Sequence, residues 1–546
     1  MLTQTRLRIR KLKCDEKKPH CRRCTSTGRK CEGYARELPP GVRLSRPAYL
    51  QSGPSDPRER RALQFFCEAA GPHLSGPLDS YFWTHLVMQF SYFEPAVRHS
   101  LVSISALHEQ IQDYSQSRPR LTDSFTSLIH YNKAIQEVRA LDNEPLVVLV
   151  CVLFICIEFL QGNSKAALEH CRHGIMLLHR VEDNYPWARE YLTPIFRRLS
   201  NLPVYFGEVS MPFSKMADLG PDPIPDAFDS LSHAQFFIDD TMNRLIGLER
   251  DMESSGSIEE SRKHGTHVQE FRERLDAINA TLDDWYIRLQ ELEARSPTPP
   301  DRIRERGNIV LRYHTGRVWA DTMFRENEMA FDEHLDRFQL MVDESERLRP
   351  IDTGRPRPKF TFEMGFAPML CFTIMKCRHL DTRLRALDML RTLGIPQENM
   401  WDTLALWAMC RCTIEVEHGI SIDDDGKPCD TTVDWTTMPP DENRVLSSSC
   451  NSGVVTREGP DGRVVSGRMA DFILRSREGK LYTRSEFVPD TSDPALMAKG
   501  DSARPQFVPA PRKRIADQTL SVRVKDESAT DVTEKEWPFS DFKSVT

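Results

Sequence analysis

Four cysteines near the N-terminus, spaced C-x6-C-x2-C-x6-C inside a basic run, constrain this chain more than any other feature. They are Cys14, Cys21, Cys24 and Cys31. The first 34 residues carry eleven Lys and Arg against three Asp and Glu, a net charge of +8, whereas the other 512 residues carry −15. A segment this short cannot bury enough apolar surface to fold without a covalent or metal staple. The cysteines and the charge together predict that residues 1–34, called the head below, are cross-linked through their cysteines and contact nucleic acid.

The sequence favours zinc, and not disulfides, as the cross-link of this segment. Residues 1–6 contain no apolar run of the kind that begins a secretory signal, so we do not expect export into an oxidising compartment. In a reducing compartment, cysteine thiolates at such spacings bind zinc rather than forming disulfides. We therefore expect zinc as the cofactor, with Cys14, Cys21, Cys24 and Cys31 as its ligands.

The segment resembles the fungal zinc binuclear cluster, in which six cysteines hold two zinc ions. That family reads C-x2-C-R-x-R-x-x-K-C-D, then a loop with proline, then C-x2-C, then a last cysteine before Gly-Tyr. Residues 8–15 (RIRKLKCD) match the second half of the opening, Pro19 matches the loop, and Gly33 and Tyr34 match the end. The first two family cysteines fall at Gln4 and Leu7.

The departure at positions 4 and 7 limits the metal content. In the family the first and fourth cysteines each bridge both metals, so neither of the two sites is closed by four protein ligands here. The four cysteines present could hold a single zinc ion. Two explanations stay open: a segment upstream of Met1 supplies the missing C-x2-C, or the chain has lost the two-zinc fold.

The resemblance also implies which side chains contact DNA. In the family, the helix that ends at the third cysteine enters the major groove at a CGG-like triplet. By position, Arg10 and Lys11 would read bases, because Arg and Lys hydrogen-bond to guanine O6 and N7. Arg8 and Lys13 would hold phosphates and fix the register. The remaining expected contacts, from the second half of the cluster, are Arg22, Arg23 and Lys30.

These residues predict a nuclear, sequence-specific regulator of RNA polymerase II genes, such as those for nutrient use or a secondary-metabolite cluster. Its expected partners are double-stranded DNA, the transcription machinery and, through the helical region, a second copy of the chain, but no membrane. The alternative is a helical protein-interaction or ligand-sensing regulator with a vestigial cluster and no DNA binding. An enzyme is not expected, because the sequence has no P-loop, G-x-G-x-x-G, G-x-S-x-G or H-E-x-x-H motif.

The expected fold class is mainly α, in five parts. A zinc cluster at 1–34 precedes a Pro-rich linker at 35–60, where five prolines rule out a continuous helix. A helical regulatory domain should follow at 61–420, then an irregular segment with β-hairpins at 421–505 and a disordered tail at 506–546. The helical region resembles the middle regulatory domain of fungal factors in three stretches, at 94–99, 106–109 and 159–163.

Two stretches of the helical region allow sharper predictions. The longest apolar run, 146–157, is too short for a bilayer, which takes about 20 residues, so we expect a buried core helix. Between 268 and 292, apolar residues alternate three and four apart in an a/d seam, which predicts either an intermolecular coiled coil or packing on a helix of the same chain, such as 309–329. Trp285 in the seam favours the second interpretation. The seam consists of Val268, Phe271, Leu275, Ile278, Leu282, Trp285, Leu289 and Leu292.

The C-terminal part carries weaker signals. Residues 423–426 (DDDG) predict a turn, and the two β-rich stretches around Asp461 and Gly462 predict a hairpin. An acidic, aromatic stretch at 531–542 has the composition of an activation segment or of a solvated tail. The ten cysteines outside the head are expected to be reduced core residues. The candidate nuclear-import cluster is Arg512, Lys513 and Arg514.

Overall fold

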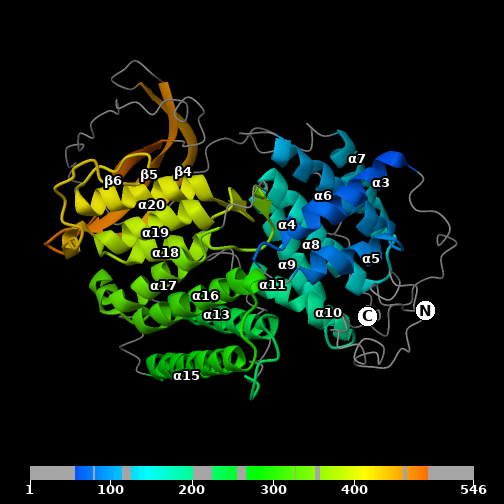
Figure 1. Cartoon of the computed structure of the whole chain (residues 1–546), viewed down its shortest axis with the longest axis horizontal. Helices are drawn as coiled ribbons and strands as arrows, with labels where there is room; N and C mark the ends of the chain where they lie inside the picture. Colours follow the sequence, from blue (N-terminus) through cyan, green and yellow to red (C-terminus); the bar gives the residue numbers. More distant parts are fainter. Residues whose placement is uncertain are drawn as a thin grey trace.

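A computed structural model describes residues 56–77, 80–113, 125–200, 224–254, 266–325, 327–350, 357–458 and 464–489. Helices fill most of the described chain up to residue 418, and a small antiparallel sheet follows (Figure 1). The mainly α fold class predicted from the sequence is therefore confirmed. The predicted zinc cluster, most of the linker and the C-terminal tail lie outside the described residues.

The first helical block is built around one apolar helix. Its helical elements are α3 (Pro57–Phe65), η2 (Phe66–Ala70), α4 (Gly71–Leu74), η3 (Phe82–Leu86), α5 (Val87–Ser91), α6 (Pro95–Asp113), α7 (Phe125–Arg139), α8 (Glu144–Gln161), α9 (Ser164–Val181), α10 (Pro186–Tyr191) and α11 (Thr193–Leu199). Every residue of helix α8 from Pro145 to Leu160 except Val147 is buried, since α6 and α9 both pack against it. It is apolar enough to cross a bilayer, but 83% of it is buried inside this block, as predicted for a core helix.

The start of α3 corrects one sequence prediction. The linker was expected to reach residue 60, but helix α3 begins at Pro57. Proline is tolerated in the first helical turn because its missing N–H has no intrahelical acceptor there. The carboxylate of Asp56 caps the helix by accepting the backbone N–H of Arg58 at 2.8 Å.

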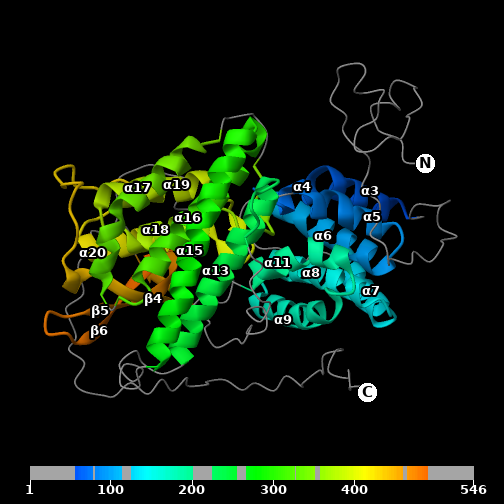
Figure 2. The ribbon, with the colours of Figure 1, turned by 90° about the horizontal axis from the view of Figure 1, so that it is seen from below.

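The second block contains a three-helix layer and a four-helix layer. Figure 2 shows α13 (Leu231–Ser254), α15 (Thr266–Arg295) and α16 (Ile303–Thr322) running side by side. The other layer is formed by α17 (Leu335–Arg347), α18 (Ala367–Lys376), α19 (Leu380–Leu393) and α20 (Thr403–His418). Two short 3-10 turns, η6 (Pro300–Arg302) and η7 (Glu328–His334), precede α16 and α17. Each layer buries its own apolar cluster, and α16 contributes to both.

The heptad seam of α15 packs inside the chain. Leu282 and Trp285 are fully buried, and the seam faces α13 as well as α16. The intramolecular interpretation is therefore confirmed, with α16 as the anticipated partner and α13 as an additional one. Val268 lies outside the residues whose side chains are described.

A three-stranded sheet of dipeptides joins the two blocks. Its strands are β1 (Phe360–Thr361), β2 (Gln397–Glu398) and β3 (Trp401–Asp402), with β1 parallel to β2. The backbone N–H of Phe362 donates to the carbonyl of Leu74 at 3.0 Å, and the amide of Gln397 donates to the carbonyl of Phe159 at 2.8 Å. Because Phe360 and Phe362 are buried in the first core, this strand anchors the second block to the first.

The C-terminal sheet covers one face of α20. Strands β4 (Val445–Glu458), β5 (Val464–Arg475) and β6 (Leu481–Pro489) are antiparallel and consecutive, after the short turn η8 (Asp441–Asn443). Glu458 pairs with Val464, so the predicted hairpin around residues 461–462 is present, although 459–463 lie outside the described residues. The third strand was not anticipated. The predicted turn at 423–426 is also present, since Asp423 accepts the backbone N–H of Asp425 and of Lys427.

The cysteines correct a second prediction. Six of the ten outside the head are buried free thiols, as predicted, and Cys371 is half-buried. The other three, Cys67, Cys429 and Cys450, are exposed. Cys67 lies on the solvent side of a helical turn, and Cys429 and Cys450 belong to the segment after α20, where less of the chain is covered by a core.

Candidate functional site

The residues predicted to bind metal and DNA lie outside the described part of the chain. The same holds for the nuclear-import candidates. The residues concerned are Arg8, Arg10, Lys11, Lys13, Cys14, Cys21, Arg22, Arg23, Cys24, Lys30, Cys31, Arg512, Lys513 and Arg514. Their roles therefore remain predictions from the sequence.

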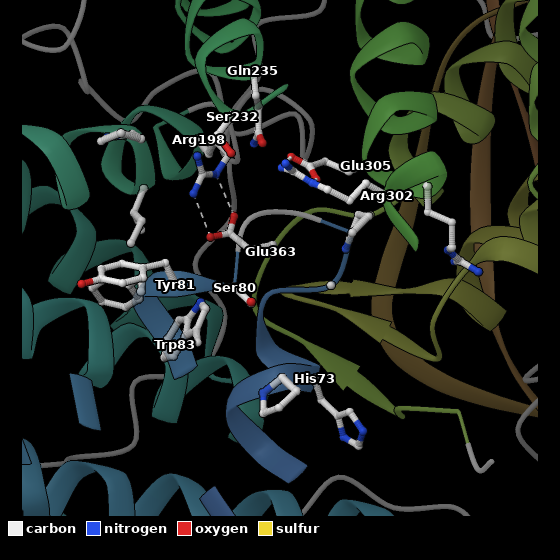
Figure 3. A pocket seen from close by; sticks show the side chains of 18 of the residues that line it. His73, Ser80, Tyr81, Trp83, Arg198, Ser232, Gln235, Arg302, Glu305 and Glu363 are labelled. Carbon is white, nitrogen blue, oxygen red and sulfur yellow. Dashed lines mark hydrogen bonds and ion pairs between the residues drawn. The ribbon is translucent and has the colours of Figure 1, made fainter. Parts of the chain in front are cut away.

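Within the described residues, a cavity of about 1610 Å³ lies where the two helical blocks meet. Its wall combines side chains from α4, η3, α10 and α11 of the first block with side chains from α13, η6 and α16 of the second. The residues on either side of β1, the end of α19 and the segment that leads into β2 complete it. Figure 3 shows residues from both blocks facing the same space. Its volume exceeds the 300–1,000 Å³ of common small-molecule pockets.

A buried ion-pair network forms one side of the cavity. The guanidinium of Arg198 donates two hydrogen bonds to the carboxylate of Glu363, at 2.8 and 2.9 Å (Figure 3). Arg198 also pairs with Asp239 at 3.6 Å, and Asp239 pairs with Arg312. Burial lowers the pKa of Arg198, but Glu363 and Asp239 raise it by more, so its pKa lies above the ordinary value. These charges satisfy one another and hold α11, α13, α16 and the segment after β1 together.

A second pair of arginines on the cavity wall is not compensated in this way. No salt bridge joins Arg304 or Arg357 to a carboxylate among the described residues, although Arg357 donates to the carbonyl of Leu393 at 3.4 Å. Burial and the charge of Arg357 lower the pKa of Arg304, and the charge of Glu398 partly opposes this. Arg304 is half-buried and Arg357 is exposed, and because the two positive charges repel each other, an anion beside them would be favoured.

Glu398 completes this wall from strand β2. Its carboxylate accepts the backbone N–H groups of Gly365, Ala367 and Ile395 at 3.0, 3.1 and 3.2 Å. Burial nevertheless dominates and raises the pKa of Glu398 to about 7. A carboxyl group with such a pKa can be neutral or ionised near neutrality, so the charge at this end of the cavity depends on pH.

Aromatic side chains form the apolar part of the cavity. Tyr81, Trp83 and Tyr191 line it from the first block, with the rings of Tyr81 and Tyr191 stacked at 5.3 Å between centroids. The indole N–H of Trp83 is buried and has no acceptor among the described residues. The wall therefore offers an aromatic surface and two cations.

Sequence reasoning did not find this cavity. Its residues come from segments up to about 300 positions apart and share no motif. The one signal in the sequence was indirect, because the stretch 94–99 and its neighbours resembled a regulatory domain without indicating a ligand site. The cavity exists because the two blocks are joined, both through β1 and through the ion pairs between α11 and α13.

Comparison with known proteins finds a family match at the N-terminus and two similar transcription regulators. Residues 8–40 match the fungal Zn(2)-Cys(6) binuclear cluster domain. The aspercryptin biosynthesis cluster-specific transcription regulator atnN of Emericella nidulans is 29% identical, over 34% of this chain and 36% of that protein. The transcription regulator lscL of Purpureocillium lilacinum is 28% identical, over 32% of this chain and 47% of that protein. This chain thus matches less than half of either relative's length. No solved structure matches the chain.

The matched domain is a zinc-binding domain, and the chemistry of its donor set can be compared with that metal. The range 8–40 contains four cysteines where the domain's name specifies six. Four thiolates are the complete ligand set of one tetrahedral structural zinc ion. The four cysteines therefore fit zinc, and they are enough to enclose one ion.

Proposed function

We propose that this chain, a fungal zinc cluster transcription regulator by its N-terminal domain, is a nuclear protein that binds a specific DNA sequence and controls RNA polymerase II genes. The match of residues 8–40 to the binuclear cluster domain carries this proposal. The concentration of positive charge in the same segment supports it, because phosphate neutralisation supplies most of the affinity for DNA. The predicted helical regulatory domain at 61–420 would follow this head in the chain.

The basic residues before Cys14 would divide into two roles. Arg10 and Lys11 would donate to guanine O6 and N7 of a CGG-like triplet and so read sequence. Arg8 and Lys13 would contact phosphates, which positions the helix without selecting bases. Zinc, held by Cys14 and the three cysteines that follow, would fix the orientation of this helix. Arg22, Arg23 and Lys30 would add phosphate contacts.

The names of the relatives suggest the class of target genes. The protein atnN is named as a regulator specific to one biosynthesis cluster. By this similarity we propose that the present chain regulates genes of a secondary-metabolite cluster. The direct test is to locate the chain on chromatin in its own fungus. Binding to promoters of one contiguous gene cluster is expected, and binding only to dispersed promoters outside any cluster would contradict it.

Selection of DNA by the full chain tests the DNA-binding function. Duplexes with a randomised core are incubated with the zinc-loaded protein and bound molecules are sequenced. We expect enrichment of a CGG-like triplet, and loss of enrichment when Cys14, Cys21, Cys24 and Cys31 are all replaced by Ser. Equal recovery of all sequences by the unaltered protein would contradict the proposal and favour the alternative, a regulator without DNA binding.

The cavity between the blocks favours a second function, the sensing of a small ligand. Arg304 and Arg357 have no carboxylate partner among the described residues, and Tyr81 and Trp83 offer aromatic surface. This combination suits a small organic anion with an apolar or aromatic body. A thermal-shift screen of aromatic and aliphatic carboxylates with the full chain tests it. A shift that disappears in Arg304→Gln but persists in Arg272→Gln, an exposed arginine of α15, is expected. Equal shifts in both variants would contradict it.

A further inference from the structure

A cluster of two histidines and a glutamate lies at the start of the described chain, away from the cavity. Glu59 comes from α3, His99 from α6 and His130 from α7. The side chains of Glu59 and His99 are 13% and 12% exposed, and His130 is buried. The three side chains are therefore largely sheltered from bulk water, while Glu59 and His99 keep a small exposed fraction.

The spacing of the three ligand atoms is that of a metal site. Nδ1 of His99 lies 3.0 Å from Nδ1 of His130 and 4.0 Å from Oε1 of Glu59. All three ligand atoms lie within 4.8 Å of one another. Two nitrogens bound to one tetrahedral zinc ion at about 2.05 Å stand about 3.3 Å apart. To close the site around an ion, the Glu59 oxygen would have to move toward the two imidazole nitrogens, by about 0.7 Å relative to His99.

The protonation state of the histidines suits metal binding. Burial, with smaller effects from His130, Arg98 and Lys133, lowers the pKa of His99 to about 4. Burial also lowers the pKa of His130, against the opposing effects of Glu59 and Asp56. Both imidazoles are thus neutral at pH 7, and the neutral ring is the form that binds metals. In the 3.0 Å hydrogen bond one Nδ1 carries the proton, so metal binding requires that ring to move its proton to Nε2, with no net release.

We propose that Glu59, His99 and His130 bind one Zn²⁺ ion through a carboxylate oxygen and two imidazole nitrogens, leaving a fourth position for water. Two histidines with one glutamate form a known zinc ligand set with an open position. The carboxylates of Glu59 and Asp56 provide negative charge beside the site, and Arg98 and Lys133 oppose it. This inference is independent of the proposed function, because none of its residues belongs to the cysteine-rich head.

The ion would attach α3 to the α6–α7 pair. The described contacts of α3 with α6 include a hydrogen bond from Ser105 Oγ to the carbonyl of Ala62 at 2.9 Å and an exposed ion pair between Arg61 and Glu109. A metal bond at Glu59 would add a third attachment near the beginning of the helix. Since α3 is the first described helix of the chain, metal occupancy would fix the start of the helical region against α6 and α7.

Metal binding is tested on the full chain with Cys14, Cys21, Cys24 and Cys31 all replaced by Ser, so that the head contributes no thiolate. We expect one Zn²⁺ per chain by metal analysis after dialysis. We expect Co²⁺ to give the visible bands of nitrogen and oxygen ligands without thiolate charge transfer. A rise in Tm with added Zn²⁺ is also expected. Absence of bound metal in this protein would overturn the proposal.

Variants of the ligands identify the site. His130→Asn and the near-isosteric Glu59→Gln are each expected to weaken Zn²⁺ binding at least tenfold and to remove the zinc-dependent rise in Tm. The matched control is His173→Gln on α9, which leaves all three ligands in place and should bind one Zn²⁺ as before. Glu59→Gln keeps the shape of the side chain, so its fold is checked by circular dichroism and its zinc affinity is measured on folded protein. Unchanged affinity in both ligand variants would show that the zinc is bound elsewhere and would overturn the assignment.

Discussion

The indole N–H of Trp285 in α15 donates to the backbone carbonyl of Ala234 in α13 at 2.7 Å. Trp285, a seam position of the heptad pattern, therefore bonds to a helix of the same chain. The ring of Trp285 also stacks on Tyr313 of α16, with 5.5 Å between the centroids. Both neighbours of α15 thus meet at one side chain, which explains why a bulky residue occupies a seam that otherwise resembles a coiled coil.

Truncation of this seam should cost stability rather than association. Leu282 is fully buried, and Leu282→Ala is expected to lower the free energy of unfolding by about 2–5 kcal/mol through lost burial and the cavity left behind. Ile287 on the same helix is half-exposed, and Ile287→Ala should lower the free energy of unfolding by much less than Leu282→Ala does. Denaturant unfolding and analytical ultracentrifugation check the prediction. Loss of self-association by Leu282→Ala at unchanged stability would instead indicate an intermolecular zipper.

The buried ion pairs beside the cavity should be sensitive to removal of one partner. Asp239 is buried and faces Arg198 and Arg312, so Asp239→Asn is expected to cost about 3–5 kcal/mol by leaving a buried cation uncompensated. Asp251, on the same helix α13, pairs with Arg274 at 2.7 Å while half-exposed. Asp251→Asn should cost about 1 kcal/mol or less. Equal losses of unfolding free energy in the two variants would contradict the role given to burial.

The raised pKa of Glu398 predicts a pH dependence of stability. Burial raises the pKa of the folded carboxyl to about 7, from an ordinary value of 4.5 for glutamate. The folded state therefore binds more protons between these values, and stability should fall as the pH rises through this window, by on the order of 3 kcal/mol. In Glu398→Gln this contribution should be absent. Unfolding free energies of both proteins at pH 5 and pH 7.5 test it, and identical pH dependence would contradict the assignment.

Local patterns in the sequence were sufficient to predict individual helices, but not to predict which helices pair or which distant residues form a site. The apolar run at 146–157 predicted a buried core helix, and it lies within α8 inside the first block, because a run of apolar residues is a local property. The pairing of α15 with α13 could not be predicted, since many helices of suitable polarity compete for one seam. The exposed Cys67 was misassigned because cysteine is usually buried.

The candidate sites show the same limit. The zinc ligands of the head share one short motif, so their spacing alone identified them. Glu59, His99 and His130 are 40 and 31 positions apart along the chain and meet only because α3, α6 and α7 pack together. No spacing rule links them. The cavity likewise required two blocks to be joined by β1, a two-residue strand with no sequence signature.

The number of zinc ions in the head follows from its ligands. With four cysteines, residues 1–34 should hold at most one tightly bound zinc ion, since a closed structural site uses four. The test uses the full chain with His130→Asn, which removes the second proposed site, and metal analysis after dialysis. One zinc ion per chain is expected. Two tightly held ions would contradict the prediction.

Base readout by the predicted recognition helix is the central claim, and duplex titration at several salt concentrations tests it most directly. With the full chain, Arg10→Ala or Lys11→Ala should cost about 1–3 kcal/mol on the preferred site and relax the choice of base there. Lys13→Ala should weaken binding to matched and mismatched duplexes alike. It should also reduce the salt slope by about one unit, because the variant neutralises one phosphate fewer and so releases about one counterion fewer. If all three substitutions lowered matched and mismatched binding equally, this helix would not read bases and the account would be wrong.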